Sequence, residues 1–259
     1  GFGSTAIGYQ TKASWYYSTA MGKDTLANGK YSTSMGVISV ASGPSSTAMG
    51  FGTTASGDYS TAMGNSTKAL AFSSTAMGHR TEALQYYSTA MGKSTKASGY
   101  SSTAIGEETT ANGKYSTSMG YKTVANGTSS IAIGYESRTN GPYALAQGYQ
   151  SYANGIASIA MGYQAKACGA YGISLGQQNY AQGKNSFAAG VHSIASGDYS
   201  TALGGGYEPW GSIGLLPSKA NGKGSLAVGS NVEANGDYSF AFGSGTMIAS
   251  HSWAFTDYA

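Results

Sequence analysis

Hydrophobic and polar positions alternate along the chain in a pattern that repeats every fourteen residues. A five-residue unit close to Ser-Thr-Ala-Met-Gly closes each repeat, and its glycine recurs without a slip through residue 204. These glycines are Gly8, Gly22, Gly36, Gly50, Gly64, Gly78, Gly92, Gly106, Gly120, Gly134, Gly148, Gly162, Gly176, Gly190 and Gly204. Such a short and regular period indicates a solenoid, in which each repeat forms one coil.

Each repeat divides into two seven-residue halves. A second glycine lies seven residues after most of the first set, often within Asn-Gly, as in Asn28-Gly29 and Asn112-Gly113. Within each half, small and variable residues alternate with a period of two, which is typical of a β-strand. We therefore expect coils of two short strands joined by tight turns, with the glycines at positive φ. Successive coils would stack in parallel register about 4.8 Å apart.

The alternation also predicts which side chains point into the coil. Serine and alanine share one face of the first strand, as in Ser60 and Ala62, and threonine and alanine share one face of the second, as in Thr53 and Ala55. Because these small residues persist from repeat to repeat, we expect them to form the interior. Nothing larger than threonine should fit there, and the hydroxyls should bond to one another or to the backbone.

The opposite face of the first strand carries most of the large apolar side chains. One column is mainly methionine, and the column beside it is threonine from Thr5 to Thr117 and larger apolar residues from Ile131 onward. We call these two columns the Thr/Met face. A long apolar strip is typical of a partner surface, and the simplest partner for a repeated strip is an identical chain. The expected contact residues are Met21, Met35, Met49, Met63, Met77, Met91, Ile105, Met119, Ile133, Ile159, Met161, Ile173, Leu175, Phe187, Leu203, Phe240 and Phe242.

The outward positions of the second strand are mixed and mostly polar. They include Gln10, Lys12, Asp24, Lys68 and Glu82. We expect them to form a solvated outer wall on which the sequence is free to vary.

A longer period appears just before the serine of each repeat, where tyrosine alternates with a small or polar residue. Tyr59, Tyr87 and Tyr115 stand at every second coil, with Ser73 and Ser101 between them. Tyrosines two coils apart are separated by about 9.6 Å, so we expect each ring to lie across the small residue of the neighbouring coil. The pattern favours packing along the edge, and a ladder of ligand-contacting rings is the alternative.

The repeat is interrupted once, after Gly204. The next matching glycine is Gly229, which places an inserted loop at residues 205–217 between a regular roll at 1–204 and the last coils at 218–259. The loop contains Tyr207 and Trp210, which either pack on a neighbouring chain or contact a ligand. The outward columns turn aromatic after the loop, so a cap leading to a neck or stalk is expected at the C-terminal end.

Composition and charge exclude several classes of protein. Of 259 residues, 40 are glycine, 41% are hydrophobic and the net charge is only +3, which argues against a disordered chain. Glycine does not recur at every third position, so the chain is not collagen. No basic cluster supports nucleic-acid binding, and no apolar run is long enough to span a membrane. The single cysteine, Cys168, permits no disulfide within the chain.

The sequence offers little catalytic chemistry. Gly172-Ile173-Ser174-Leu175-Gly176 matches the nucleophile elbow of hydrolases, but Ser174 falls in the interior alanine column. His79, His192 and His251 occupy three different columns, so we expect neither a metal site nor a cofactor. Because coils of small residues offer no concave pocket, we do not expect an enzyme.

The tandem Ser-x-Ala-Ile/Met-Gly-x-x-Thr/Ser-x-Ala-x-Gly unit resembles the YadA-like head of trimeric autotransporter adhesins over nearly the whole chain. The resemblance implies a left-handed parallel β-roll, with three chains packed through the Thr/Met face. Here threonine and methionine replace the valine and isoleucine more common in that family, which implies a softer interface. The first residues include neither a start methionine nor a signal peptide, so we expect the chain to be a segment of a longer protein. The resemblance implies that a stalk and a membrane anchor lie outside this segment.

The same resemblance implies display on the outer surface of a Gram-negative bacterium and attachment to host extracellular-matrix proteins, cells or other surfaces. We expect neither nucleic acid nor direct membrane contact among its partners. Two other functions remain open. The threonine column could form the regular surface of an ice-binding solenoid, although the neighbouring methionines favour burial. The roll could also serve as a spacer in a phage or secreted fibre.

Overall fold

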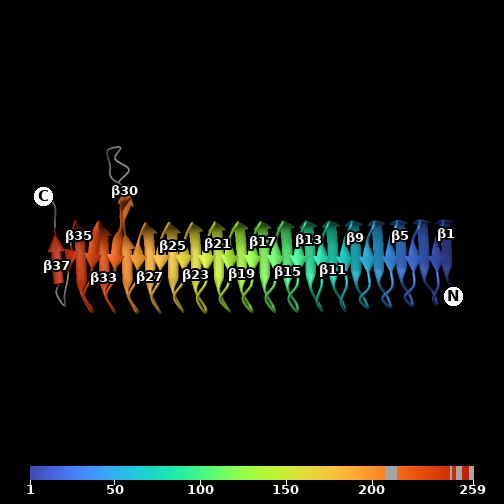
Figure 1. Cartoon of the computed structure of the whole chain (residues 1–259), viewed down its shortest axis with the longest axis horizontal. Coiled ribbons are helices and arrows are strands. Elements are labelled where there is room, and N and C mark those ends of the chain that lie inside the picture. Colours follow the sequence, from blue (N-terminus) through green and yellow to red (C-terminus); the bar gives the residue numbers. More distant parts are fainter. Residues whose placement is uncertain (208–214, 246, 249–252, 257–259) are drawn as a thin grey trace. The chain divides into compact units, whose positions relative to one another are not determined.

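A computed structural model describes residues 1–207, 215–245, 247–248 and 253–256 of the chain. These residues form strands and turns, with no helix among them. They belong to two compact units, residues 1–129 and residues 130–259. In both units, the strands of successive coils point in the same direction (Figure 1).

In the first unit, each coil contributes one five-residue strand and one two-residue strand. The longer strands are β1 (Thr5–Tyr9), β3 (Thr19–Lys23), β5 (Thr33–Val37), β7 (Thr47–Phe51), β9 (Thr61–Asn65), β11 (Thr75–His79), β13 (Thr89–Lys93), β15 (Thr103–Glu107) and β17 (Thr117–Tyr121). The shorter strands are β2 (Lys12–Ala13), β4 (Leu26–Ala27), β6 (Val40–Ala41), β8 (Thr54–Ala55), β10 (Lys68–Ala69), β12 (Glu82–Ala83), β14 (Lys96–Ala97), β16 (Thr110–Ala111) and β18 (Val124–Ala125).

The second unit repeats this arrangement and carries the insertion. Its first strands are β19 (Ile131–Tyr135), β21 (Leu145–Tyr149), β23 (Ile159–Tyr163), β25 (Ile173–Gln177), β27 (Phe187–Val191), β29 (Thr201–Gly204), β33 (Leu226–Ser230), β35 (Phe240–Ser244) and β37 (Trp253–Thr256). Its second strands are β20 (Arg138–Thr139), β22 (Tyr152–Ala153), β24 (Lys166–Ala167), β26 (Tyr180–Ala181), β28 (Ile194–Ala195), β32 (Ser218–Ala220), β34 (Val232–Ala234) and β36 (Met247–Ile248). Two further strands, β30 (Gly206–Tyr207) and β31 (Leu215–Leu216), pair antiparallel within the insertion.

Most neighbouring coils pair in parallel with an offset of fourteen residues, as the repeat predicts, whereas β35 and β37 place Phe240 opposite Trp253, one residue fewer. Met77 of β11 lies opposite Met63 of β9 and Met91 of β13, so identical columns align. The insertion leaves this register intact, because β29 pairs directly with β33 and places Thr201 opposite Leu226. The expectation of an all-β parallel solenoid with two strands in each coil is therefore confirmed.

The glycine that closes each first strand is required by the backbone. Gly78 has a φ of +123°, and a Cβ atom added there would lie 2.0 Å from the carbonyl oxygen of Gly92 in the next coil. Both the backbone conformation and the contact exclude an L side chain at this position. The unbroken glycine column is thus a condition for stacking the coils.

The expectation of positive φ at the second glycine of each repeat is wrong. Gly99 lies outside the left-handed region, and in its coil an added Cβ would lie 2.0 Å from the carbonyl oxygen of Gly113, although Ala71 and Gln85 take this position elsewhere. The left-handed residue of this turn comes two positions later, at Ser101, with a φ of 51°. In the turn after the first strand, a left-handed residue likewise follows two positions after the glycine. Gln10 and Asp24, which were expected on the second strand, are such turn residues, with φ values of 54° and 55°.

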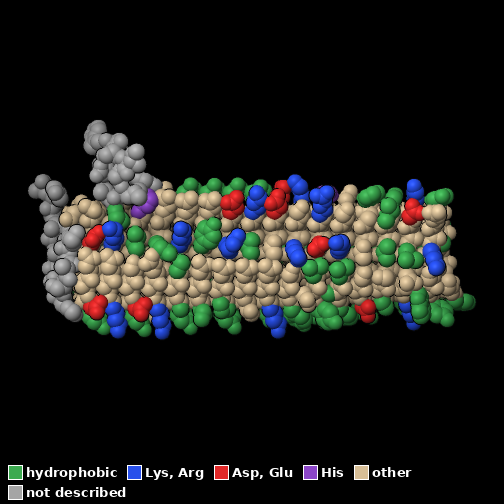
Figure 2. All heavy atoms as spheres, viewed as in Figure 1, with side chains coloured by type: hydrophobic (Ala, Val, Ile, Leu, Met, Phe, Trp, Pro, Cys, Tyr) green, Lys and Arg blue, Asp and Glu red, His purple; other side chains and the backbone are tan. Residues whose placement is uncertain are grey.

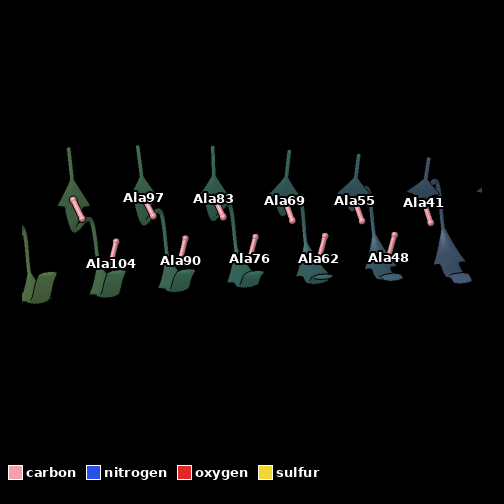
Figure 3. Packing of buried hydrophobic residues seen from close by; sticks show 11 residues of the cluster. Ala41, Ala48, Ala55, Ala62, Ala69, Ala76, Ala83, Ala90, Ala97 and Ala104 are labelled. Carbon is pink, nitrogen blue, oxygen red and sulfur yellow. The ribbon is translucent and has the colours of Figure 1, made fainter. Parts of the chain in front are cut away.

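The interior consists of small side chains, as predicted. Alanines from the first strands and the second strands point toward one another across the coil (Figure 3). In the first unit, Ala62, Ala69, Ala76 and Ala83 have no exposed surface. Two residues exceed the expected size limit, because Asn179 and Val232 are also fully buried. Asn179 fits since its amide donates to the carbonyl oxygen of Gly190 at 2.7 Å and accepts from the Ser193 N–H at 2.7 Å.

The buried hydroxyls divide into two groups. Several serines close the turn that precedes their strand: Ser102 Oγ donates to the carbonyl oxygen of Gly99 at 2.7 Å and accepts from its N–H at 3.1 Å. The expected bonds to neighbouring groups are missing for many threonines, however. Within the described residues, the hydroxyls of Thr53, Thr81 and Thr95 are buried without a hydrogen-bond partner. These threonines fill the interior mainly through their methyl groups.

We predict that Gly78→Ala lowers the free energy of unfolding by about 3 kcal/mol or more, because it adds both a steric overlap and an unfavourable φ. Gly52→Ala is the control. Gly52 is also left-handed, but an added Cβ would meet only Ser66 Oγ, at 3.8 Å, so this change should cost about 1 kcal/mol. Urea denaturation at one fixed protein concentration measures both values, and equal costs would contradict the proposed role of the close backbone approach.

A second pair of variants tests the two groups of hydroxyls. We expect Ser102→Ala to destabilise the chain by about 1 kcal/mol, since it removes two hydrogen bonds to Gly99, whose N–H and carbonyl keep their backbone bonds to Ala111 and Ser102. Thr81→Val should leave stability unchanged or raise it by up to about 1 kcal/mol, because it removes a buried hydroxyl that has no partner and keeps the side-chain volume. Thermal denaturation followed by circular dichroism compares them, and a strongly destabilised Thr81→Val variant would contradict this assignment.

Candidate functional surfaces

The Thr/Met face of the first unit is formed by the outward side chains of the five-residue strands. Met63, Met77 and Met91 follow one another on β9, β11 and β13, and each is half-buried in the single chain. Threonine accompanies methionine on every one of these strands. Outward-pointing methionines on successive strands form a continuous apolar ribbon, which advances by about one strand spacing with each coil.

In the second unit, the corresponding outward columns carry larger side chains. Ile159 and Ile173 take the threonine position on β23 and β25, followed by Phe187 on β27. Toward the end of the unit, Phe240 and Phe242 stand opposite Leu226 and Val228. All these side chains point outward and are half-buried. Within each unit, the predicted contact residues therefore lie on the outward face of the first strands, and Met119 is the most exposed among them at 37%.

The first strand has a third outward column that the sequence reasoning missed. It lies two residues beyond methionine and holds Lys93, which forms an ion pair with Glu107 at 2.7 Å. This contact raises the pKa of Lys93, chiefly through the hydrogen bond to Glu107. In the second unit, the same column stacks the rings of Tyr135, Tyr149 and Tyr163 with centroids 4.9 and 5.0 Å apart. The column thus borders the Thr/Met face with charged and aromatic side chains.

The tyrosines of alternate coils form part of a longer aromatic row in the first unit, which we call the tyrosine edge. Its members are Tyr59, Phe72, Tyr87, Tyr100 and Tyr115, with successive centroids 5.5, 5.6, 5.7 and 5.7 Å apart. Each contact is edge-to-face. The rings of this row meet aromatic rings from the adjacent position of neighbouring coils. The expected packing across a small residue is found at Tyr17, whose ring lies against Gly3.

The outer wall carries charge without concentrating it. Figure 2 shows charged side chains spread in rows on the face in view, with neutral atoms between them. Lys68 and Glu82 on adjacent strands of this wall form an ion pair at 3.1 Å. Lys219 and Glu233 form another, which lowers the pKa of Glu233 mainly through the hydrogen bond from the lysine. Exposed pairs of this kind contribute little to stability.

Part of the outer wall in the second unit is hollowed. Gln178, Gln164 and Gln150 form an amide ladder, in which each Nε2 donates to the preceding Oε1 at 2.8–2.9 Å. The ladder ends where Gln150 donates to Glu136 Oε2 at 2.8 Å. Beside it runs a column of long side chains on consecutive strands, namely Tyr152, Lys166, Tyr180 and Ile194.

The space between these two columns is a groove of about 590 Å³, which we call the amide groove. His192, Asn179 and Pro217 complete its lining. Burial lowers the pKa of His192, so this side chain favours its neutral form near pH 7 and Lys166 supplies the positive charge of the lining. The expectation that such coils offer no concave pocket is therefore wrong. The walls of the groove are long outward side chains in two neighbouring columns. The prediction had considered only the small residues of the interior.

Other candidate groups have ordinary structural roles. Ser174 is buried, and its hydroxyl donates to the carbonyl oxygen of Asn179 at 2.9 Å. Cys168 lies 3.7 Å from the hydroxyl of Tyr180, and this contact is the main cause of the raised pKa of Tyr180. Within the described residues, no group of three or more His, Cys, Asp or Glu side chains is placed to hold a metal ion. A membrane-spanning helix is likewise not found in that part of the chain.

The inserted loop is described at its base alone. Tyr207 and Leu215 pair through their backbones in the β30–β31 ribbon. Trp210, a candidate ligand contact, lies outside the described residues.

These features define a parallel β-solenoid whose candidate functional residues lie on its outer faces. The sequence profile of the YadA head domain repeat matches residues 1–25, 16–37, 27–53, 41–67, 69–95, 97–123, 111–137, 125–151, 140–165, 153–179, 181–206 and 220–246. The chain therefore belongs to the YadA head family, an adhesin-type family without enzymatic activity that is associated with trimeric autotransporters of the bacterial surface. A comparison with curated proteins gave no match.

The tyrosine edge generates a prediction about stability. Tyr87→Ser removes two edge-to-face contacts, with Phe72 and Tyr100, and should destabilise the chain by about 1–2 kcal/mol. Serine occupies the same turn position in neighbouring coils, so the backbone tolerates it. Tyr143→Ser is the control, because Tyr143 is 65% exposed and makes no ring contact within the described residues. Similar unfolding midpoints for the two variants would show that the row contributes no packing energy.

Proposed function

We propose that the chain is the head of a trimeric adhesin that attaches a bacterial cell to extracellular-matrix proteins, cells or other surfaces of a host. The Thr/Met face is the observation that carries this proposal. It recurs on most coils, where its side chains are mostly half-buried in the single chain, and it lines up identical residues on successive strands such as β9, β11 and β13. Membership of the YadA head family supports three chains as the number that meet.

The energetics favour assembly through this face. Complete burial of a methionine or isoleucine side chain stabilises by about 1.5–3 kcal/mol, and a half-buried one has about half of that still to gain. Over the many coils that carry such residues, the gain exceeds the cost of bringing three chains together. The outer wall and the tyrosine edge remain on the solvent side of the assembly.

Assembly also supports attachment. Three chains present each outward site three times, and repeated weak contacts raise the overall strength of attachment when several engage at once. A solenoid with charge spread thinly over its outer wall suits such distributed contacts, because no single deep site dominates. The host-facing residues of the proposal include Tyr59, Tyr87 and Tyr115 of the tyrosine edge, together with Tyr207 and Trp210 of the inserted loop.

Solution mass measured by light scattering at several dilutions tests the assembly. We expect a species of three times 26.3 kDa, about 79 kDa. The double variant Met63→Glu/Met91→Glu should shift the mass to that of a monomer, because it places charges in the buried strip two coils apart. The control Thr54→Glu/Thr110→Glu changes two outer-wall residues of the same unit and should remain trimeric.

A monomeric unmodified chain would contradict the proposal and would favour the threonine column as an ice-binding surface, measurable as thermal hysteresis. Attachment is tested separately by binding of the trimer to immobilised collagen, fibronectin and laminin. Binding that the monomeric variant loses and the control variant keeps would support attachment by several contacts. A trimer that binds none of these proteins and no host cells would contradict the attachment role.

A further inference from the structure

The amide groove is built by two ridges that run side by side along four consecutive coils. One ridge consists of turn residues and contains Gln150, Gln164 and Gln178, while the other contains Tyr152, Lys166 and Tyr180 on β22, β24 and β26. The two columns are only two residues apart in each coil, so their long side chains enclose a narrow trough. Three strand spacings give the trough a length of about 14 Å.

The amide ridge retains unused hydrogen-bonding capacity. Each glutamine side chain has two N–H donors, and the ladder uses one of them. The hydrogen bonds between neighbours fix the orientation of the amides. A ligand lying in the trough therefore meets a row of fixed donors at a regular spacing of about 4.8 Å.

The opposite ridge offers two aromatic faces with a cation between them. Tyr152 and Tyr180 stand two coils apart, about 9.6 Å, and Lys166 lies on the strand between them. Lys166 Nζ lies 5.9 Å from the centre of the Tyr180 ring and is exposed at its head. No carboxylate belongs to the described lining of the groove, so the lysine is available to an anionic ligand.

A second hollow lies on the other side of the same ridge. It measures about 330 Å³ and is lined by Tyr152, Asn154, Lys166, Cys168 and Tyr180. The ridge is thus flanked by open space on both sides, and both rings are accessible. Aromatic rings at a regular spacing, bordered by amides, provide apolar faces and polar edges to the same ligand.

From this arrangement we infer that the amide groove binds an extended, negatively charged oligosaccharide. Sugar rings stack on Tyr152 and Tyr180, a carboxylate or sulfate of the sugar between them pairs with Lys166, and the ring hydroxyls bond to the glutamine amides. The rise of one sugar along an extended glycan is close to the ~4.8 Å between coils, so successive sugars meet equivalent groups. The inference rests on the proposed attachment function in one respect: it takes the target of attachment to be a surface that bears glycans.

Calorimetric titration of the intact chain with soluble hexasaccharides tests the inference without a surface. The probes are a sulfated hexasaccharide from heparin, a carboxylated hexasaccharide from hyaluronan, and neutral cellohexaose. We expect one or both anionic probes to bind, and the neutral probe to bind at least about tenfold more weakly. The stronger of the two anionic probes identifies sulfate or carboxylate as the preferred group. Hexaglutamate is the peptide control and should bind more weakly than either.

Two variants connect the binding to the groove. Lys166→Glu should weaken the preferred anionic hexasaccharide by at least about tenfold. Its matched control is Lys12→Glu, which changes the same position of a Lys-Ala strand in the first unit and is not part of the groove lining. The double variant Tyr152→Thr/Tyr180→Thr should also weaken binding about tenfold, and threonine already occupies this column at Thr54 and Thr110. Circular dichroism and solution mass verify that each variant stays folded and assembled.

The inference fails if neither anionic hexasaccharide binds, if cellohexaose or hexaglutamate binds equally well, or if the groove variants bind like the Lys12→Glu control. Failure of the attachment function is seen in a different measurement, since a chain that binds the soluble hexasaccharide but no host surface contradicts attachment alone. A chain that attaches to host surfaces equally with and without Lys166→Glu contradicts only the groove.

Discussion

The structure depends on how closely the backbones of successive coils approach one another. At Gly78 a Cβ atom would lie 2.0 Å from the next coil's carbonyl oxygen, and Gly99 shows the same distance on the other turn. The contact at the closing glycine therefore admits glycine alone, whereas the second turn position holds Trp15, Ala71 or Gln85 in some coils. The insertion is accommodated because the strands on either side of it keep their pairing, β29 with β33 and β28 with β32.

This close packing has an energetic consequence. A coil so narrow encloses alanine, serine and threonine, with Asn179 and Val232 as the largest interior residues. Such an interior buries little apolar surface, and some of its hydroxyls have no partner within the described residues. The backbone ladders hold each coil to the next, while the larger apolar side chains stand outside on the Thr/Met face. The trimer that we propose buries these side chains, so assembly supplies what the interior lacks.

The sequence predicted the coil, its register and the direction of its side chains, because periods of two and fourteen residues determine all three. It did not predict the turn geometry: Asn-Gly suggested a left-handed glycine, but the left-handed residue is two positions later and is often tyrosine or serine. The tyrosine edge was only half visible, since Phe72 and Tyr100 stand one position away from Tyr87 in the repeat. The amide groove went unnoticed, although Gln150, Gln164 and Gln178 recur at the repeat spacing. Residues at turn positions do not alternate between polar and apolar as strand residues do. Whether they form a groove therefore depends on the side chains in the neighbouring column.

The formation of a groove depends on the lengths of the side chains in two neighbouring columns. In the first unit, Ser66 stands beside Lys68 and Ser94 beside Lys96, so at these coils a long side chain faces a short one. In the second unit, glutamine accompanies tyrosine or lysine over consecutive coils, and two ridges arise. The backbone is the same in both cases. Side chains of the outer wall and the turns can therefore change without altering the coil, whereas the glycine column and the interior cannot. Recognition in such a solenoid is determined by runs of outward residues in neighbouring columns, and a few substitutions suffice to create or remove a site.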